Sequence, residues 1–288
     1  MTSGVRSMFL STLAFSLSNV FVKQVAHIPA METVFFRCSI ATVFCLVGLY
    51  RAKASPIGSN HWQLVLRGGF GTMALFCFFL TLREIPLASA MTIQYLSPIF
   101  TTIIAIFILS EKVRASQWLF YAIAFSGVLV IHQFDSRISP LYLALGIFSA
   151  FCSGMAYNLV RSLRGREHPP TVVFHFQIVG VVVGFVSLFF AWETPQGWDW
   201  LFLFLIGVFS QLGQIFLTNA LQREPVAGVA IINYTGLIYA ITIGWFVFGE
   251  GQTVMSIAGM LLVVIGVLLS IVFGRRPKKI EEIEASAA

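Results

Sequence analysis

Long uninterrupted runs of apolar residues dominate the chain, and short polar segments separate them. Each run is about 20 residues long, which is the length that an α-helix needs to cross the hydrocarbon core of a bilayer. The runs do not alternate between apolar and polar positions, so a transmembrane β-barrel is disfavoured. Ten runs qualify as spans: Ser7–Ala26, Thr33–Tyr50, Leu64–Leu82, Leu87–Ser110, Ser116–Gln133, Leu141–Ser162, Thr171–Trp192, Trp198–Leu221, Val226–Gly249 and Thr253–Phe273. The pattern predicts an all-α integral membrane protein with ten transmembrane helices.

Composition excludes a soluble or disordered chain. Hydrophobic residues make up 58% of the 288 residues and charged residues only 10%, whereas a soluble domain carries about 25% charged residues. The first apolar run contains Asn19 and lacks a small-residue cleavage site after it, so we expect it to be retained as a helix. The four cysteines lie inside apolar runs without metal-binding spacing, so we expect no metal and no cofactor.

The distribution of basic residues predicts the orientation of the chain. Fourteen of the 18 Lys and Arg residues lie on the side of the predicted membrane that holds both termini, and the charged tail 277–288 is on that side. The positive-inside rule therefore places both termini in the cytoplasm. This topology accounts for the net charge of +6 without a nucleic-acid partner. The compact length favours a bacterial inner membrane, with lipid and a small-molecule substrate as partners.

The sequence contains an internal repeat. Segment Pro86–Tyr95 resembles segment Pro225–Tyr234, at an offset of 139 residues. The same offset pairs Glu111 with Glu250, Gly127 with Gly266 and Asn19 with Asn158. The repeat divides the chain into halves 1–135 and 136–276 with five spans each, and an odd number of spans inverts the second half. Inverted repeats are typical of alternating-access transporters, with the binding site near the midplane between the halves.

Several motifs resemble one family. The runs Arg83-Glu-Ile-Pro-Leu-Ala-Ser-Ala90, Tyr95-Leu-Ser-Pro-Ile-Phe100, Leu109-Ser-Glu-Lys112 and Phe125-Ser-Gly-Val-Leu-Val-Ile131 resemble the EamA family of the drug/metabolite transporter superfamily. Glu32-Thr-Val-Phe-Phe-Arg37 and Leu66-Arg-Gly68 are similar to the branch that includes S-adenosylmethionine carriers. The resemblance implies ten helices in two inverted five-helix halves, and a central cavity lined mainly by spans 1, 3, 4, 6, 8 and 9.

The predicted function is secondary transport of a small amphipathic metabolite, such as an amino acid, an amino acid derivative or an S-adenosylmethionine-like compound. The two inverted halves are expected to rock around the central cavity. An exporter of organic anions or drugs is the alternative within the same class. A channel or an integral-membrane enzyme is the alternative outside it, but no filter-like repeat, HExxH motif or mid-span Asp is present. No catalytic residue is therefore expected.

Polar residues inside the spans are the candidate substrate-binding residues, because buried polar groups in a bilayer are costly. Gln94 and Tyr95 lie in the fourth span, and Asn233 and Tyr234 are their repeat equivalents in the ninth. Pro98 cannot donate a hydrogen bond to the carbonyl of Gln94, which predicts a kink there. These two amide–tyrosine pairs are the main site hypothesis, and hydrogen bonding between helices is the alternative reading.

Further polar residues could line the same cavity or hold helices together: Asn19, Tyr157, Asn158, Gln211 and Gln214. Arg37 lies well within the second span and could bind a carboxylate or phosphate, pair with Glu32 or Glu84, or extend to the interface. Lys23 is interpreted as an interface residue and His175 as a hydrogen-bonded structural one.

Two further groups have expected roles at helix ends and surfaces. Glu111 and Glu250 lie at equivalent span ends and are candidates to cap or gate, and Pro86 and Pro225 could act as hinges at the starts of the same spans. Gly180 and Gly184 form a GxxxG motif, which favours close helix approach. The same motif offers a route to a homodimer.

Overall fold

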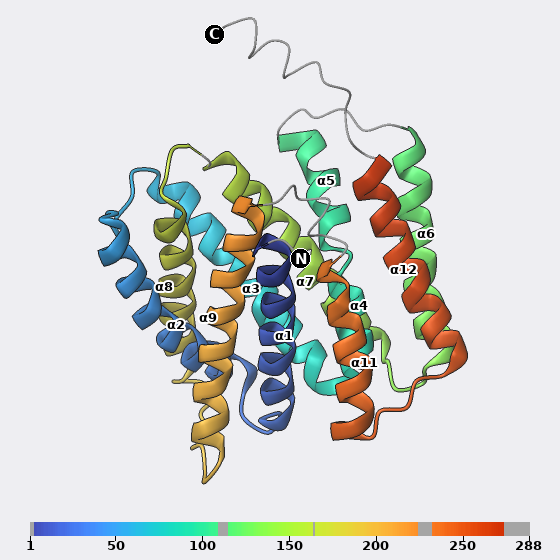
Figure 1. The fold of residues 1–288 in the computed structure, drawn as a ribbon. Coiled ribbons are helices and arrows are strands. Elements are labelled where there is room, and N and C mark those ends of the chain that lie inside the picture. Colours follow the sequence, from blue (N-terminus) through green and yellow to red (C-terminus); the bar gives the residue numbers. More distant parts are fainter. Residues whose placement is uncertain (1–2, 109–114, 164, 224–231, 274–288) are drawn as a thin grey trace, which may run out of the picture.

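The computed structural model describes residues 3–108, 115–163, 165–223 and 232–273, and these residues form helices and short connections (Figure 1). Glu111, Pro225 and the charged tail 277–288 lie outside the described residues, so the roles predicted for them stay predictions. The helices are α1 (Ser3–Gln24), α2 (Ala30–Ala52), α3 (His61–Glu84), α4 (Leu87–Gln94), α5 (Ser97–Ile108), α6 (Ala115–Phe134), α7 (Pro140–Ser162), α8 (Pro169–Ser187), α9 (Asp199–Arg223), α11 (Thr235–Phe248) and α12 (Val254–Phe273).

Nine segments of the described chain are long and apolar enough to cross a membrane, with α4 and α5 together forming one of them. Helix α11 is a shorter apolar helix in the position of the ninth predicted span. The prediction of an all-α, ten-helix membrane fold is therefore confirmed.

The two halves of the chain run in opposite directions. Helix α1 ends at the lower end of the bundle in Figure 1, whereas α7, the first helix of the second half, begins there. We call this the lower end throughout, and it also holds the connections between α3 and α4 and between α11 and α12. The upper end holds the start of α1 and the end of α12.

Helices from the two halves interleave. Helix α1 packs on α9, α2 on α8, α3 on α7 and α6 on α12, so each of these pairs takes one helix from each half. The halves also meet where α5 of the first half packs on α7 of the second. Rocking of the two inverted halves around a central cavity stays a prediction.

Glycines allow a close approach between α6 and α12. A Cβ atom on Gly127 would lie 2.5 Å from the carbonyl oxygen of Gly259, and a Cβ on Gly259 would lie 2.7 Å from the carbonyl oxygen of Gly127. Backbone atoms cannot move aside as a side chain can. Glycine at both positions is therefore what allows α6 and α12 to touch.

The GxxxG motif on α8 packs against α2 of the same chain. A Cβ on Gly180 would lie 2.5 Å from Cys38 Sγ, and a Cβ on Gly184 would lie 2.8 Å from Phe35 Cβ. The expected role in close helix approach is thus met within the chain, since small residues let two helix backbones come together.

The fourth predicted span is broken at the expected position. Helix α4 ends at Gln94 and α5 begins at Ser97, with Tyr95 and Leu96 in a turn between them. Pro98 lacks the N–H that would continue the helix to the carbonyl of Gln94. The helical path is also interrupted at Tyr234, the repeat equivalent of Tyr95.

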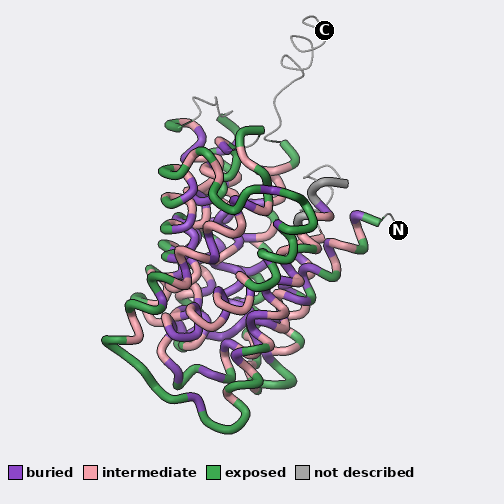
Figure 2. Tube along the Cα trace, turned by 90° about the vertical axis from the view of Figure 1, so that its left-hand side faces the viewer, coloured by how far each residue is buried: buried purple, intermediate pink, exposed green. Residues whose placement is uncertain are grey.

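Burial follows the arrangement expected in a bilayer. Figure 2 shows buried residues along the middle of the bundle and exposed residues at its ends and outer faces. The outer faces carry large apolar side chains, such as Phe190, Phe246 and Leu129. A soluble protein rarely exposes so much contiguous apolar surface, and lipid would cover it here.

Candidate functional site

Two repeat-related tyrosines meet at the centre of the molecule. The rings of Tyr95 and Tyr234 have centroids 4.8 Å apart and planes at 63°. The Tyr95 hydroxyl donates to the carbonyl oxygen of Asn233 over 3.2 Å. Residues at equivalent repeat positions can touch only near the axis that relates the two halves. The structure therefore brings together three of the four residues of the main site hypothesis, on the symmetry axis.

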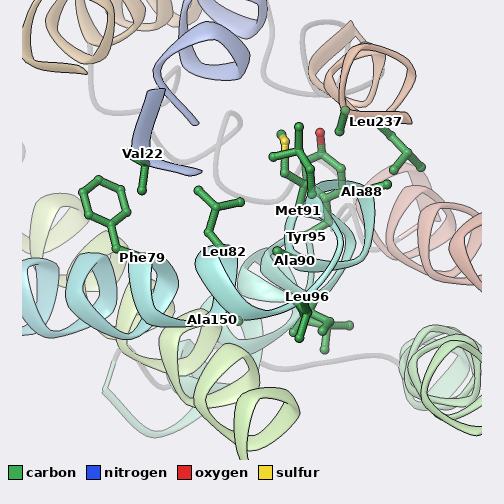
Figure 3. Close-up of a cluster of buried hydrophobic side chains, with 14 of the residues drawn as sticks. Val22, Phe79, Leu82, Ala88, Ala90, Met91, Tyr95, Leu96, Ala150 and Leu237 are labelled. Carbon is green, nitrogen blue, oxygen red and sulfur yellow. The ribbon is translucent and has the colours of Figure 1, made fainter. Parts of the chain in front are cut away.

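Neighbouring residues give this tyrosine pair its geometry. A Cβ on Gly236 would lie 2.7 Å from the Tyr95 hydroxyl, so only glycine leaves room for that hydroxyl. Figure 3 shows Met91 and Tyr95 projecting from the same side of α4, one turn apart. Asn19 of α1 contacts the Met91 sulfur through its amide nitrogen at 3.6 Å. Asn19 therefore belongs to the same centre as the tyrosines.

Two other candidates hold helices together. Gln94 donates to Ser153 Oγ at 2.8 Å and accepts from Ser149 Oγ at 3.0 Å, which uses both ends of its amide. Asn158 donates to the backbone oxygens of Thr101 and Gly154 at 2.9 and 3.0 Å. For both side chains the structure favours the alternative reading, hydrogen bonding between helices.

Arg37 lies in a second buried cluster, between α2, α3, α8 and α9. Its Nε donates to Ser210 Oγ at 3.0 Å, and its guanidinium carbon lies 5.7 Å from the centre of the Phe176 ring. The Arg67 guanidinium carbon lies 4.3 Å from the centre of the same ring. Only 4% of Arg37 is exposed. Arg37 therefore makes neither the expected ion pair with Glu32 or Glu84 nor an excursion to the interface.

Sequence reasoning missed Arg67, which it counted among the cytoplasmic-side charges. The structure turns its guanidinium into the bundle, where a Cβ on Gly71 would lie 2.6 Å from Arg67 Nη1. The available signal was its position one turn inside the predicted third span, with glycine four residues later. That spacing places the two residues on one face of the helix.

The remaining candidates lie on α7 and α9. Tyr157 of α7 is 48% exposed. Gln211 of α9 donates to Cys45 Sγ at 3.6 Å and therefore faces α2. Gln214 lies half-buried three residues further along α9.

A polar contact joins helix ends at the lower end. Lys23, at the end of α1, forms an ion pair with Glu250, which follows α11. Glu250 Oε2 also accepts from the backbone N–H of Leu87 at 2.7 Å, and Lys23 Nζ donates to the carbonyl oxygen of Ile85 at 2.8 Å. We call Lys23, Glu250 and the Leu87 N–H the latch. Lys23 is therefore not the simple interface residue that we expected.

His175 has the structural role that the sequence suggested. Its Nδ1 lies 3.0 Å from the carbonyl oxygen of Thr171, one turn earlier on α8.

A hollow of about 390 Å³ lies beside the latch, where Glu250 and Trp245 contribute to its lining. The tyrosine pair and Arg37 are not part of that lining, so the hollow is separate from both clusters.

Ten apolar segments, two equivalent helix interruptions and paired polar residues at the centre define a multi-pass membrane transporter. Residues 2–133 and 140–272 match the EamA-like transporter family. Because these segments cover most of the chain, the chain belongs to that family. It is a transporter of a small metabolite, as the sequence predicted.

Relatives agree with this assignment. The chain is 31% identical to the pseudopaline exporter CntI of Pseudomonas aeruginosa, over 91% of this chain and 94% of the exporter. It is 25% identical to the S-adenosylmethionine uptake transporter of Rickettsia prowazekii, over 91% and 90% of the two chains. It is 29% identical to human solute carrier family 35 member G1, over 88% and 75%. A crystal structure that is 16% identical shares the fold, with a TM-score of 0.69 over 96% of this chain and 99% of the other.

Proposed function

We propose that this transporter is an alternating-access carrier for a small amphipathic metabolite derived from an amino acid, and that the substrate passes the centre formed by Tyr95 and Tyr234. The observation that carries the proposal is the contact between these two repeat-related tyrosines. A binding site on the axis of an inverted repeat can present equivalent groups to both sides of the membrane. The interruptions of the helical path beside both rings support the same reading.

The orientation follows from the basic residues. The positive-inside rule places both termini on the cytoplasmic side of a bacterial inner membrane. The lower end then faces the opposite side. The latch then closes the outer side. Rocking of the two inverted halves would open one side as it closes the other. The names of the relatives include both an exporter and an uptake transporter, so the direction of transport is left to measurement.

Counterflow in proteoliposomes tests the proposal. Proteoliposomes that contain the purified protein are loaded with one member of a panel of amino acids, S-adenosylmethionine and small carboxylates. Uptake of the same compound in labelled form is then recorded. We expect saturable exchange of one class, reduced at least tenfold in Tyr95→Ala and Tyr234→Ala. Tyr50→Ala is the matched control, because Tyr50 is 87% exposed at the end of α2. Unsaturable flux of small ions without exchange would indicate a channel and refute the carrier.

A further inference from the structure

Two arginines from different helices converge on one aromatic ring inside the bundle. Arg37 of α2 and Arg67 of α3 both lie over Phe176 of α8, at 5.7 and 4.3 Å from the ring centre. Two like charges are brought close together where the low dielectric strengthens their repulsion. Such an arrangement costs free energy unless something compensates it.

The protein compensates this charge only in part. In the described ranges, no Asp or Glu lies within ion-pair distance of either guanidinium. The Nε and Nη1 atoms of Arg67 are buried and have no hydrogen-bond partner. The face of the Phe176 ring attracts each cation, but it cannot accept all the N–H groups. Buried donors without partners are costly, and more so when they are charged.

The cluster is connected to the centre of the transporter. Arg37 donates to Ser210, and the Ser210 hydroxyl lies 2.8 Å from the hydroxyl of Ser18 on α1. The next residue of α1, Asn19, contacts Met91 beside Tyr95. Adjacent residues of one helix therefore face the arginine cluster and the tyrosine centre.

We propose that Arg37 and Arg67 bind a carboxylate group of the transported metabolite beside the Phe176 ring. This inference rests on the proposed carrier function and narrows its substrate to an anionic, carboxylate-bearing amino acid derivative. A carboxylate supplies the acceptors that the Arg67 donors lack, and the planar guanidinium matches it in a bidentate fashion. In the chain without substrate, two buried Arg67 donors lack acceptors among the described residues, and the substrate carboxylate would supply them.

Matched ligands test this inference by thermal stability in detergent. Glutamate and glutamine, and aspartate and asparagine, differ by one charge at constant shape, and citrate adds further carboxylates. We expect glutamate, aspartate or citrate to raise the melting temperature, the neutral amides to do so much less, and Arg37→Gln and Arg67→Gln to weaken carboxylate affinity at least tenfold. Arg67→Lys keeps the positive charge but loses the planar guanidinium that can bind a carboxylate through two N–H groups, so an intermediate carboxylate affinity is expected.

Arg83→Gln is the matched control. Arg83 lies on the same helix as Arg67, but it donates to Thr33 Oγ1 at 2.6 Å and belongs to no cluster with Phe176. Carboxylate affinity should stay unchanged in this variant. If Arg83→Gln weakens binding as much as Arg67→Gln does, the effect is general and the inference fails.

A second measurement on the unmodified chain covers the case in which the variants do not fold. Phenylglyoxal modifies arginine, and peptide mass spectrometry reports the extent of modification at each position. Citrate or glutamate should protect Arg37 and Arg67 at least several-fold and leave Arg137 unprotected. Absence of protection would overturn the inference.

Phospholipid is the other source of an anion. If phosphatidylglycerol nanodiscs protect Arg37 and Arg67 and the carboxylates do not, the pair holds a lipid headgroup and the inference fails. Counterflow of neutral or cationic metabolites that is unaffected by Arg37→Gln and Arg67→Gln would refute the anionic substrate while the carrier function stands. Absence of any counterflow would instead refute the carrier, whereas carboxylate protection would still support the binding site.

Discussion

At the residue scale, the tyrosine centre depends on Gly236, which has no side chain. Any side chain at position 236 would meet the Tyr95 hydroxyl at 2.7 Å and Thr12 Cγ2 at 2.8 Å. We predict that Gly236→Ala displaces the hydroxyl, removes its hydrogen bond to Asn233 and lowers the counterflow rate about tenfold. The lost bond is worth about 1 kcal/mol, so the protein should still fold. Gly69→Ala is the control, since nothing lies within 4 Å of a Cβ there. Equal rates for the two variants would contradict the prediction.

A loop carboxylate at the upper end should give a pH-dependent contribution to stability. Glu167 Oε1 accepts from the Ser59 hydroxyl at 2.7 Å and from the N–H groups of Ser59 and Asn60 at 2.6 Å. These bonds, above all that from the Ser59 hydroxyl, lower the pKa of Glu167 below its ordinary value of 4.5. The folded state therefore favours the ionised form.

The sign of this effect follows from the lowered pKa. A carboxyl group with a folded pKa below its unfolded one contributes stability that is complete above the unfolded value and is lost as the pH falls through the folded value. We predict that Glu167→Gln lowers the melting temperature by a few degrees at about pH 7, and that the difference shrinks below about pH 4.5. Melting curves across pH check this, with the exposed Glu84→Gln as control. A difference that grows on acidification would contradict the assignment.

At the scale of elements, the α6–α12 pair should be more sensitive than any exposed helix face. We predict that Gly127→Ala and Gly259→Ala each destabilise the protein by about 1–3 kcal/mol, because the added methyl group meets backbone atoms that cannot repack. Gly48→Ala in α2 meets nothing within 4 Å and should be neutral or stabilising, since alanine is the better helix former. Melting temperatures measured in detergent test this predicted difference in stability. A Gly127→Ala variant as stable as Gly48→Ala would show that the helices separate without cost.

The elements themselves were predictable from sequence, because a span needs only a local run of apolar residues. The break at Tyr95 was predictable too, since Pro98 removes a specific backbone hydrogen bond. The meeting of Tyr95 with Tyr234 followed in part from their common repeat position, which indicated equivalent depth but not contact.

The rest of the candidate site depends on how each helix is rotated. From the sequence, Arg67 is interpreted as a charge at the edge of the membrane. Only the packing of α8 shows that Phe176 lies against its guanidinium. The pairing of Lys23 with Glu250 joins residues far apart in the chain that the repeat does not relate. The position of Arg67 inside the third span hinted at burial, but neither partner could be predicted locally, because each contact arises from packing between helices.

At the scale of the whole molecule, alternating access requires that contacts at one end break while those at the other form. The latch is a contact at the lower end that joins α1 to α11 and α4. Lys23 lies at the end of α1, and Glu250 follows α11 and accepts from the Leu87 N–H that begins α4. Both side chains are only 12% exposed, so solvent screens the ion pair little. Removing one partner of a buried pair leaves a costly unpaired charge. The latch should therefore stabilise the state that is closed at the lower end.

We predict that Glu250→Gln opens the lower end more often. The glutamine can still accept from the Leu87 N–H, but it no longer neutralises Lys23. The reporter is Ala88→Cys, a position 1% exposed just inside the latch, in a chain whose four native cysteines are replaced by alanine. An impermeant maleimide added outside intact cells should label it several-fold faster in Glu250→Gln. Asp199→Asn is the control, because it removes the carboxylate charge from the His27–Asp199 contact of 3.0 Å at the start of α9. Equal labelling rates in the two variants would show that the barrier to opening lies elsewhere, whereas a faster rate in Glu250→Gln alone identifies the latch as the contact that must break.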